Sequence, residues 1–110
     1  MDIERGTVYW VNCDPSLGGE IRKTRPAVVI SNNAANAALN RVQVVPITSK
    51  TDRLYPGEAL INLNGENRKV MADQLTTVSK QRLGNRLGVV VPADMERIES
   101  AVMLQLALNR

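Results

Sequence analysis

The sequence predicts one α+β domain of mainly antiparallel strands with a C-terminal α-helix. Several short segments rich in β-branched residues are separated by turns that contain glycine, proline or asparagine, which is typical of strands. Asn64-Gly65 is a favoured tight-hairpin pair, so the strands on either side of it should run antiparallel. One longer segment, at the tail of the chain, has the pattern and the capping residue of a helix.

The first two expected strands flank a loop. Residues 7–12 are rich in β-branched and aromatic types and form the first strand. Residues 13–23 contain a proline and a glycine pair, and a loop of this length in so small a domain is usually functional. The second strand, residues 26–30, starts at Arg25-Pro26. Because the residue before a proline is kept out of the helical region, Arg25 should lie on a stiff backbone at the mouth of this strand.

A short helix, three more strands and a single turn follow. Asn32 or Asn33 caps a helix over residues 34–39. In the third strand, Pro46 implies an edge, an end or a bulge, because proline cannot donate to a central ladder. Ser79 caps a turn that ends at Gly84. The expected ranges are 41–49 for the third strand, 58–63 and 69–72 for the hairpin, and 88–91 for the last strand.

The tail helix is expected over residues 93–108, with Asp94 as its N-cap and Glu96 favourable in its first turn. From residue 101 to residue 108, Gln105 is the only polar side chain, so this half is apolar nearly all round. A domain of this size has little interior in which to surround a terminal helix. We therefore expect part of this face to contact a second subunit.

Composition fits one globular domain over residues 1–110, with 44% apolar residues and a net charge of +3. This excess is compatible with a polyanionic partner. If the basic segments converge in the fold, they form one basic surface. These segments are Arg22, Lys23 and Arg25; Lys50 and Arg53; and Lys80, Arg82 and Arg86.

The residue types that are scarce exclude several chemistries. A single cysteine, Cys13, and no histidine leave no intrachain disulfide, no cysteine-clustered or ordinary zinc site, and no histidine general base. We therefore expect no metal and no cofactor. The chain starts without a signal-peptide pattern, and no apolar run reaches the ~20 residues that span a bilayer. We expect a soluble, cytoplasmic protein that does not bind a membrane.

A set of motifs in this chain resembles the MazF/PemK toxins of type II toxin–antitoxin systems, in order and spacing and over almost the whole length. The resemblance implies a small SH3-like β-barrel with a C-terminal α-helix (CcdB/MazF-like), a homodimer, a cognate neutralising antitoxin, and metal-independent, sequence-specific cleavage of single-stranded RNA such as mRNA. The motifs are Arg5-Gly6-Thr-Val-Tyr, Asp14-Pro15, Gly19-Glu20, Thr24-Arg25-Pro26-Ala-Val-Val-Ile-Ser31-Asn32, Val45-Pro46-Ile-Thr48-Ser49, Ala72-Asp73-Gln74 and the final Leu-Gln-Leu-Ala-Leu.

The resemblance also assigns site residues. In such toxins the arginine of the Arg-Pro pair and the threonine of the Pro-x-Thr segment are catalytic, which correspond here to Arg25 and Thr48. A guanidinium fork can bind two phosphate oxygens, and a hydroxyl can donate to phosphate or orient the ribose 2′-hydroxyl. Glu20 and Asp73 are candidates for a general base or for RNA contact. The candidate RNA-binding residues are Arg22, Lys23, Ser31, Asn32, Ser49, Lys50 and Gln74.

Structural roles are open for the same residues. An arginine in a basic run is most often a solvated charge, and a strand threonine commonly packs or binds the backbone. Ser31-Asn32 can simply end a strand and cap a helix, and Asp73-Gln74 can cap or turn the chain. Two residues depart from the family pattern: Thr7 where Asp is frequent, and Gly19 where a small hydroxyl residue is frequent. Gly19 adjoins the loop expected to contact RNA.

Two other functions compete with RNA cleavage. A non-catalytic toxin of the same fold binds DNA gyrase, but such a toxin needs neither the arginine nor the threonine at the strand mouth. A plain RNA-binding barrel reads bases on exposed aromatic side chains, and this chain has only three aromatic residues in all. Tyr9 and Trp10 alternate on one strand, so one should be buried and the other free to stack. We expect Trp10 to be the buried one.

Overall fold

The computed structural model describes residues 2–12 and 24–108. The predicted loop 13–23 lies outside these residues, and with it Glu20, Arg22 and Lys23. The strands are β1 (Thr7–Asn12), β2 (Thr24–Val29), β3 (Arg41–Thr48), β4 (Glu58–Leu63), β5 (Glu66–Met71), β6 (Thr76–Ser79) and β7 (Leu83–Val89). The helices are α1 (Asn33–Ala38) and α2 (Pro92–Gln105), with 3-10 turns η1 (Ala72–Gln74) and η2 (Lys80–Arg82).

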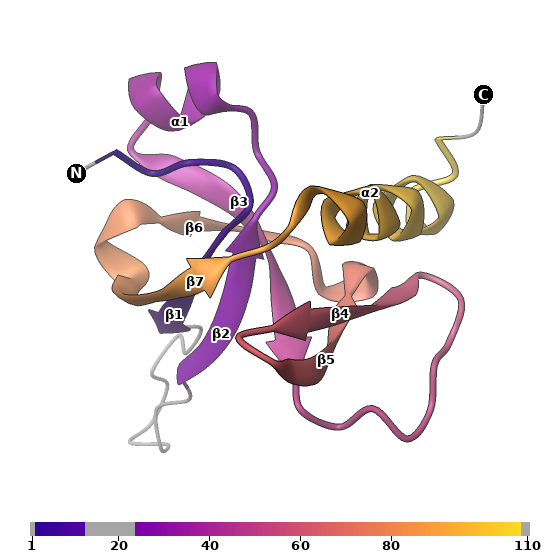
Figure 1. Cartoon of the computed structure of the whole chain (residues 1–110). Helices are drawn as coiled ribbons and strands as arrows, with labels where there is room; N and C mark the ends of the chain where they lie inside the picture. Colours follow the sequence, from indigo (N-terminus) through magenta and orange to yellow (C-terminus); the bar gives the residue numbers. More distant parts are fainter. Residues whose placement is uncertain (1, 13–23, 109–110) are drawn as a thin grey trace, which may run out of the picture.

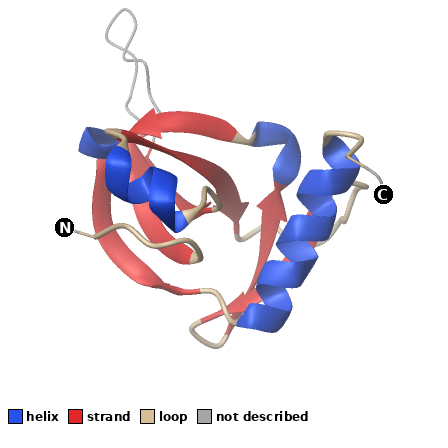
Figure 2. Ribbon diagram, turned by 90° about the horizontal axis from the view of Figure 1, so that it is seen from above, coloured by secondary structure: helices blue, strands red, loops and turns tan. Residues whose placement is uncertain are grey.

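The strands form one antiparallel sheet in the order β4-β5-β3-β2-β1-β7, with β6 beside β3 (Figure 1). Seen from above, the sheet curls round on itself, and α2 lies along its open side (Figure 2). There α2 packs against β4 and η1. The predicted α+β class, a small curled barrel of antiparallel strands with a C-terminal helix, is confirmed.

β3 is the central strand. It pairs with β2 on one side and, on the other, first with β6 as far as Val44 and then with β5 from Ile47. Pro46 lies between these two neighbours, where β3 changes partner. The expected proline irregularity is therefore the end of one pairing inside a central strand, and not an edge of the sheet.

Two hydrophobic cores lie on opposite faces of the strands, because successive side chains of a strand point to opposite faces. β2 and β3 supply both cores, which explains their continuous apolar runs. β4 has only one buried face, so buried and exposed residues alternate along it. The core beneath α2 contains Val8, Val28, Val45, Ile47, Ile61, Leu63, Val70, Val90, Met95 and Ile98. The other core contains Ile3, Tyr9, Val11, Ala27, Val29, Val42, Val44 and Val78.

Local turn and cap chemistry follows the sequence closely. Asn64 and Gly65 both have positive φ angles, 53° and 84°, as a two-residue hairpin turn with matching twist requires. β5 therefore begins directly after this turn, three residues before the predicted start. The predicted cap of α1 is confirmed, because the Asn32 side chain accepts a hydrogen bond from Ala35 N at 2.8 Å. Ser79 likewise accepts from Gln81 N at 3.2 Å.

Two parts of the sheet differ from the prediction. The sequence does not predict β6, since a four-residue strand of mixed burial leaves little periodic signal. The last strand is predicted over residues 88–91, but β7 spans Leu83–Val89. Its glycines are not turn residues here. A Cβ at Gly84 would lie 3.3 Å from the Trp10 carbonyl oxygen, so this glycine lets β7 approach β1 closely, at a register irregularity.

α2 begins at Pro92 and ends at Gln105, with Val91 rather than Asp94 at its N-cap. Proline suits the first helical position because its missing N–H would have no partner there. Asp94 is instead buried inside the first turn and accepts a hydrogen bond from Asn62 N of β4 at 3.0 Å. Within the described residues, no helix is long and apolar enough to cross a membrane.

Candidate functional site

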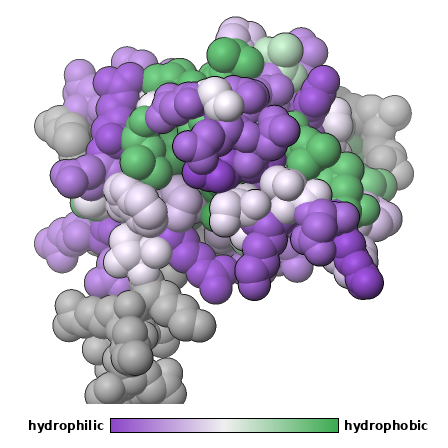
Figure 3. All heavy atoms as spheres, turned by 60° about the horizontal axis from the view of Figure 1, so that its bottom comes forward, coloured by the Kyte–Doolittle hydropathy of each residue, from purple (hydrophilic) through white to green (hydrophobic). Residues whose placement is uncertain are grey.

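A pocket of about 530 Å³ opens where β2 begins and β3 ends. In Figure 3, which brings the bottom of Figure 1 forward, the middle of this face is mostly hydrophilic. Four elements contribute to the pocket, namely β1, β2, β3 with the residues that follow it, and β5. We call it the cationic pocket; its lining residues are Trp10, Arg25, Pro26, Ile47, Thr48, Ser49, Lys50, Arg68 and Met71.

Strand register brings the two predicted catalytic residues together. Ala27 pairs with Pro46, and the same antiparallel register continued by two residues places Arg25 across from Thr48. Arg25 is also paired with Val11 of β1, so its backbone is held on that side. The sequence prediction that Arg25 stands on fixed backbone at a strand mouth is therefore consistent with its place in the fold.

The pocket carries three cations, from Arg25, Lys50 and Arg68, and no carboxylate is among its described lining residues. In the described part of the chain, no hydrogen bond or ion pair occupies the half-buried Arg25 guanidinium. Arg68 instead lies 2.6 Å from the exposed carboxylate of Glu66. A half-buried fork that has no partner among the described residues is available to bind an anion.

Arg68 is a site residue that the sequence prediction misses. It stands three residues after the hairpin turn, opposite Ile61, and next to Lys69, which pairs with Thr48. The Asn64-Gly65 turn could have predicted it. A strand that starts directly after this turn includes Arg68, next to the residue that pairs with the end of β3.

The Thr48 hydroxyl has a defined role in its own loop. Its Oγ1 accepts a hydrogen bond from Lys50 N at 3.2 Å. A hydroxyl has two lone pairs and one proton, so this contact uses an acceptor position and leaves the proton to be donated. The donor can then serve a ligand in the cationic pocket.

The burial of Tyr9 and Trp10 is the reverse of the prediction. Tyr9 is buried at 4% exposure, whereas Trp10 is 38% exposed and lines the cationic pocket. Tyr9 belongs to the core that also contains Ile3 of the N-terminal segment. Trp10 is therefore the aromatic ring that a base could stack on, beside Arg25.

Of the other predicted RNA-binding residues, Ser49 and Lys50 line the cationic pocket and Ser31, Asn32 and Gln74 do not. The side chains of Ser31 and Asn32 are used in the turn before α1, where Ser31 Oγ accepts from Gln43 N at 3.1 Å. Asp73 and Gln74 are exposed on η1. Neither residue lines the cationic pocket, although Gln74 Nε2 lies 3.6 Å from the sulfur of Met71, which does line it.

The basic segments converge only in part. Lys80 donates to the Asn36 carbonyl oxygen and lines a different pocket, together with Asp2 and Glu4. Arg82 donates to the Asn12 carbonyl oxygen at 3.0 Å, at the end of β1 that is paired with the start of β2. Neither Lys80 nor Arg82 lines the cationic pocket.

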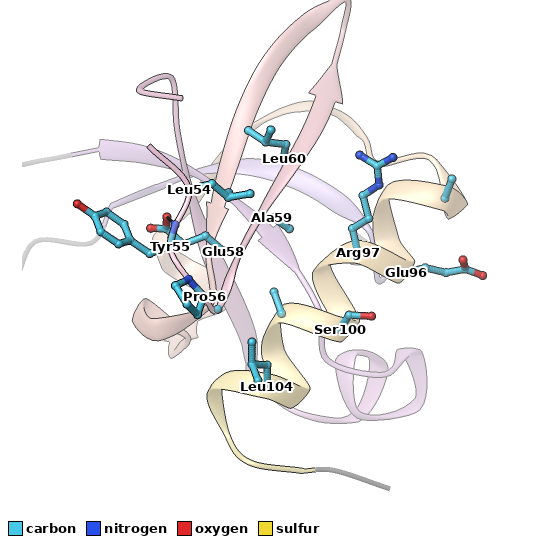
Figure 4. A pocket seen from close by; sticks show the side chains of 13 residues that line it. Leu54, Tyr55, Pro56, Glu58, Ala59, Leu60, Glu96, Arg97, Ser100 and Leu104 are labelled. Carbon is cyan, nitrogen blue, oxygen red and sulfur yellow. Dashed lines mark hydrogen bonds between the residues drawn. The ribbon is translucent and has the colours of Figure 1, made fainter. Parts of the chain in front are cut away.

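A second hollow, the apolar groove, has a volume of about 890 Å³ and lies between β4 and α2. Leu54 and Leu60 point into it from the sheet side, and Arg97, Ser100 and Leu104 lie along its helix side (Figure 4). Leu54 is 53% exposed and Leu104 is 55% exposed. Large apolar side chains at such exposure in one groove are typical of interaction surfaces.

A curled antiparallel sheet, a C-terminal helix, and a cationic pocket with a hydroxyl at the strand ends together define a small barrel protein suited to a phosphate backbone. Residues 4–106 match the model of a family described as the PemK-like, MazF-like toxin of type II toxin-antitoxin systems. The chain belongs to this family.

Known proteins of similar length support this assignment. The chain is 33% identical to the endoribonuclease MazF9 of Mycobacterium tuberculosis, over 96% of this chain and 98% of that protein. It is 28% identical to the endoribonuclease EndoA of Bacillus subtilis, over 98% and 97%. A solved mycobacterial endoribonuclease in complex with its cognate antitoxin superposes with a TM-score of 0.80, at 33% identity and 98% coverage of both chains.

Proposed function

We propose that this chain is a sequence-specific endoribonuclease toxin that cleaves single-stranded RNA in the cationic pocket and is neutralised by a cognate antitoxin. Family membership and relatives that are named endoribonucleases support the activity. The location of the active site is supported by one observation: Arg25 and Thr48 line the same pocket, together with two further cations. We also infer that the protein acts in the cytoplasm, where mRNA is accessible.

In the proposed reaction, the ribose 2′-hydroxyl loses its proton to water and its oxygen attacks the adjacent phosphorus, while the bond to the 5′-oxygen of the next nucleotide breaks and that oxygen takes a proton from water. The products are a 2′,3′-cyclic phosphate and a 5′-hydroxyl. Negative charge grows on the phosphate oxygens as the bond to the leaving oxygen breaks. Arg25 binds two of these oxygens, because its planar fork has no other partner in the described residues.

Thr48 is the second proposed catalytic residue. Its oxygen is anchored by Lys50 N, so its proton points away from that contact and is donated to a phosphate oxygen or to the 2′-oxygen. Lys50 and Arg68 bind neighbouring phosphates of the RNA strand, and Trp10 stacks on a base. None of these roles uses a metal ion.

We further propose a homodimer and an acidic antitoxin segment. The apolar groove between β4 and α2 is the surface that the second copy covers, since a chain of this size leaves these leucines exposed. A type II antitoxin neutralises its toxin by binding it, and carboxylates in that antitoxin would compete with phosphates for the cationic pocket.

The decisive experiment incubates the purified protein with a mixed-sequence RNA and maps the new ends, with and without EDTA. The expected result is cleavage at a short recurrent sequence, unaffected by EDTA, with 5′-hydroxyl ends and no cleavage of an RNA that is 2′-deoxy at the cut site. Arg25→Ala should lower the rate at least about 100-fold, which corresponds to the loss of one well-placed oxyanion donor. A 5′-phosphate product, or full activity of Arg25→Ala, would overturn the mechanism.

A further inference from the structure

A buried ion pair lies beneath the connection from β3 to β4 and takes no part in the reaction proposed above. Lys69 Nζ is 3.1 Å from Glu58 Oε1, and the two side chains keep only 9% and 11% of their exposure. Removing two charges from water costs free energy, so such a pair persists where its remaining hydrogen-bonding groups are also satisfied. The partners of this pair therefore indicate what it holds.

All of these partners belong to the connection itself. Lys69 Nζ also donates to the Arg53 carbonyl oxygen at 2.9 Å and lies 5.7 Å from the centre of the Tyr55 ring. The Glu58 carboxylate in turn accepts from Tyr55 N at 2.7 Å. One ammonium group and one carboxylate thus fix the backbone on both sides of Leu54.

The two ends of this connection, which we call the β3–β4 segment (residues 49–57), serve two different surfaces. Its first two residues, Ser49 and Lys50, line the cationic pocket, and its last four line the apolar groove. Figure 4 shows Leu54 pointing toward α2, and Tyr55 and Glu58 pointing away from it. Glu58 and Tyr55 are also lining residues of the apolar groove, so the ion pair holds the segment at the margin of that groove.

The position of Lys69 in the sheet also connects it to the start of the β3–β4 segment. Lys69 of β5 pairs directly with Thr48, the last residue of β3. The side chain that holds the segment therefore starts from the strand beside the point where the segment leaves the sheet. Thr48 itself holds the first turn of the segment through Lys50 N. The segment is therefore tied to the sheet at its start by Thr48 and near its end by Lys69.

We propose that Lys69 is a positioning residue for RNA binding: it holds the β3–β4 segment in the shape that keeps Lys50 over the cationic pocket. This inference rests on the proposed function for its readout with RNA. Its alternative is that the ion pair merely fills space, in which case uncharged side chains of similar size would replace it without any effect on the segment.

The test uses the double substitution Glu58→Gln/Lys69→Met. Lys69→Met alone would leave a buried carboxylate unpaired and strongly destabilise the chain, whereas the double variant removes both charges of this pair. The amide oxygen that Glu58→Gln introduces can still accept from Tyr55 N. The matched control is Glu99→Gln, which removes the exposed 2.9 Å ion pair between Arg5 and Glu99 on another part of the molecule. Circular dichroism at assay temperature confirms that each variant is folded.

The first readout needs no RNA. Amide hydrogen exchange within residues 49–57 should become at least about tenfold faster in the double variant, while exchange in β3 and α2 stays unchanged, because local opening is governed by local contacts. The control should match the parent protein throughout. Unchanged exchange in residues 49–57 would overturn the proposal.

The second readout is kinetic. KM should rise about tenfold, as for the loss of one charge-assisted contact, while the single-turnover rate at saturating RNA changes less than about threefold. In a Lys50→Ala background the double substitution should change KM by less than about twofold, because its effect passes through Lys50. An equal rise in KM in both backgrounds, or faster exchange with unchanged KM, would overturn the proposal. If the parent protein cleaves no RNA, the proposed function fails, and the exchange result still decides the role of Lys69 on the segment.

Discussion

At the scale of single residues, the cationic pocket depends on two side chains, Arg25 and Thr48, that have no strong partner among the described residues. Arg25 has none among the described residues, and Thr48 engages only an acceptor position of its hydroxyl. Such residues contribute little to folding stability, so substitutions there should separate activity from stability. Two predictions use this separation.

Thr48→Val should lower the cleavage rate about 100-fold, whereas Thr48→Ser should stay within about tenfold of the parent. Valine keeps the shape of threonine but removes the hydroxyl, and serine keeps the hydroxyl but removes the methyl group. Lys50 N is exposed enough to bind water when Oγ1 is absent, so stability should change by less than about 1 kcal/mol. Single-turnover cleavage and thermal melting measure the two effects. Equal rates for the two variants would contradict a hydroxyl role.

Trp10→Ala should weaken RNA binding by about 1–3 kcal/mol without destabilising the fold, because the loss is that of one base–aromatic stack on an exposed ring. Trp10→Phe should retain most of the affinity, since a smaller aromatic face still stacks. Fluorescence anisotropy with an RNA that is 2′-deoxy at the cut site reports binding without cleavage. Retention of full affinity by Trp10→Ala would place the base elsewhere.

At the scale of secondary-structure elements, local chemistry was predictable and pairing was not. β1, β4 and the caps at Asn32 and Ser79 could be read from residue types alone, because their signals lie within a few residues. Three other features depend on which strands are neighbours in the sheet: the length of β7, the existence of β6 and the exposure of Trp10. Strand pairing cannot be predicted from a single sequence. The roles of Arg25 and Thr48 could be predicted from the family motifs. That the two residues lie in one pocket could be seen only from the pairing of the strands.

Asp94 illustrates how a local signal can have a tertiary cause. An acidic residue near a helix start suggests an N-cap, but this buried carboxylate joins α2 to β4 through Asn62 N. Asp94→Ala should therefore destabilise the fold by about 1–3 kcal/mol, because it leaves a buried N–H without a partner. Glu96→Ala, two residues further along the helix and exposed, should cost less than about 0.5 kcal/mol. Urea unfolding of the two variants gives the comparison, and equal costs would reduce the role of Asp94 to helix electrostatics.

At the scale of the whole molecule, two surfaces of opposite character share the β3–β4 segment. The cationic pocket suits a polyanion, and the apolar groove suits another apolar surface. A contact that covers the groove also touches Leu54, which is four residues from Lys50. Assembly and RNA binding therefore act on the same short stretch of backbone, and a test of assembly should keep the segment itself unaltered.

Leu104→Asp meets this requirement, because it changes the helix side of the apolar groove and leaves the segment intact. A carboxylate at this position would have to be buried without a partner whenever a second copy covers the groove, which costs several kcal/mol. The substitution should therefore raise the dimer dissociation constant at least about 100-fold and leave a folded monomer at micromolar concentration. Val89→Asp is the matched control, since Val89 is similarly exposed, at 51%, but lies on β7 outside the groove. Sedimentation velocity of both variants decides the matter: dimers that survive Leu104→Asp would show that the second copy binds elsewhere, and monomers from Val89→Asp would move the interface to β7.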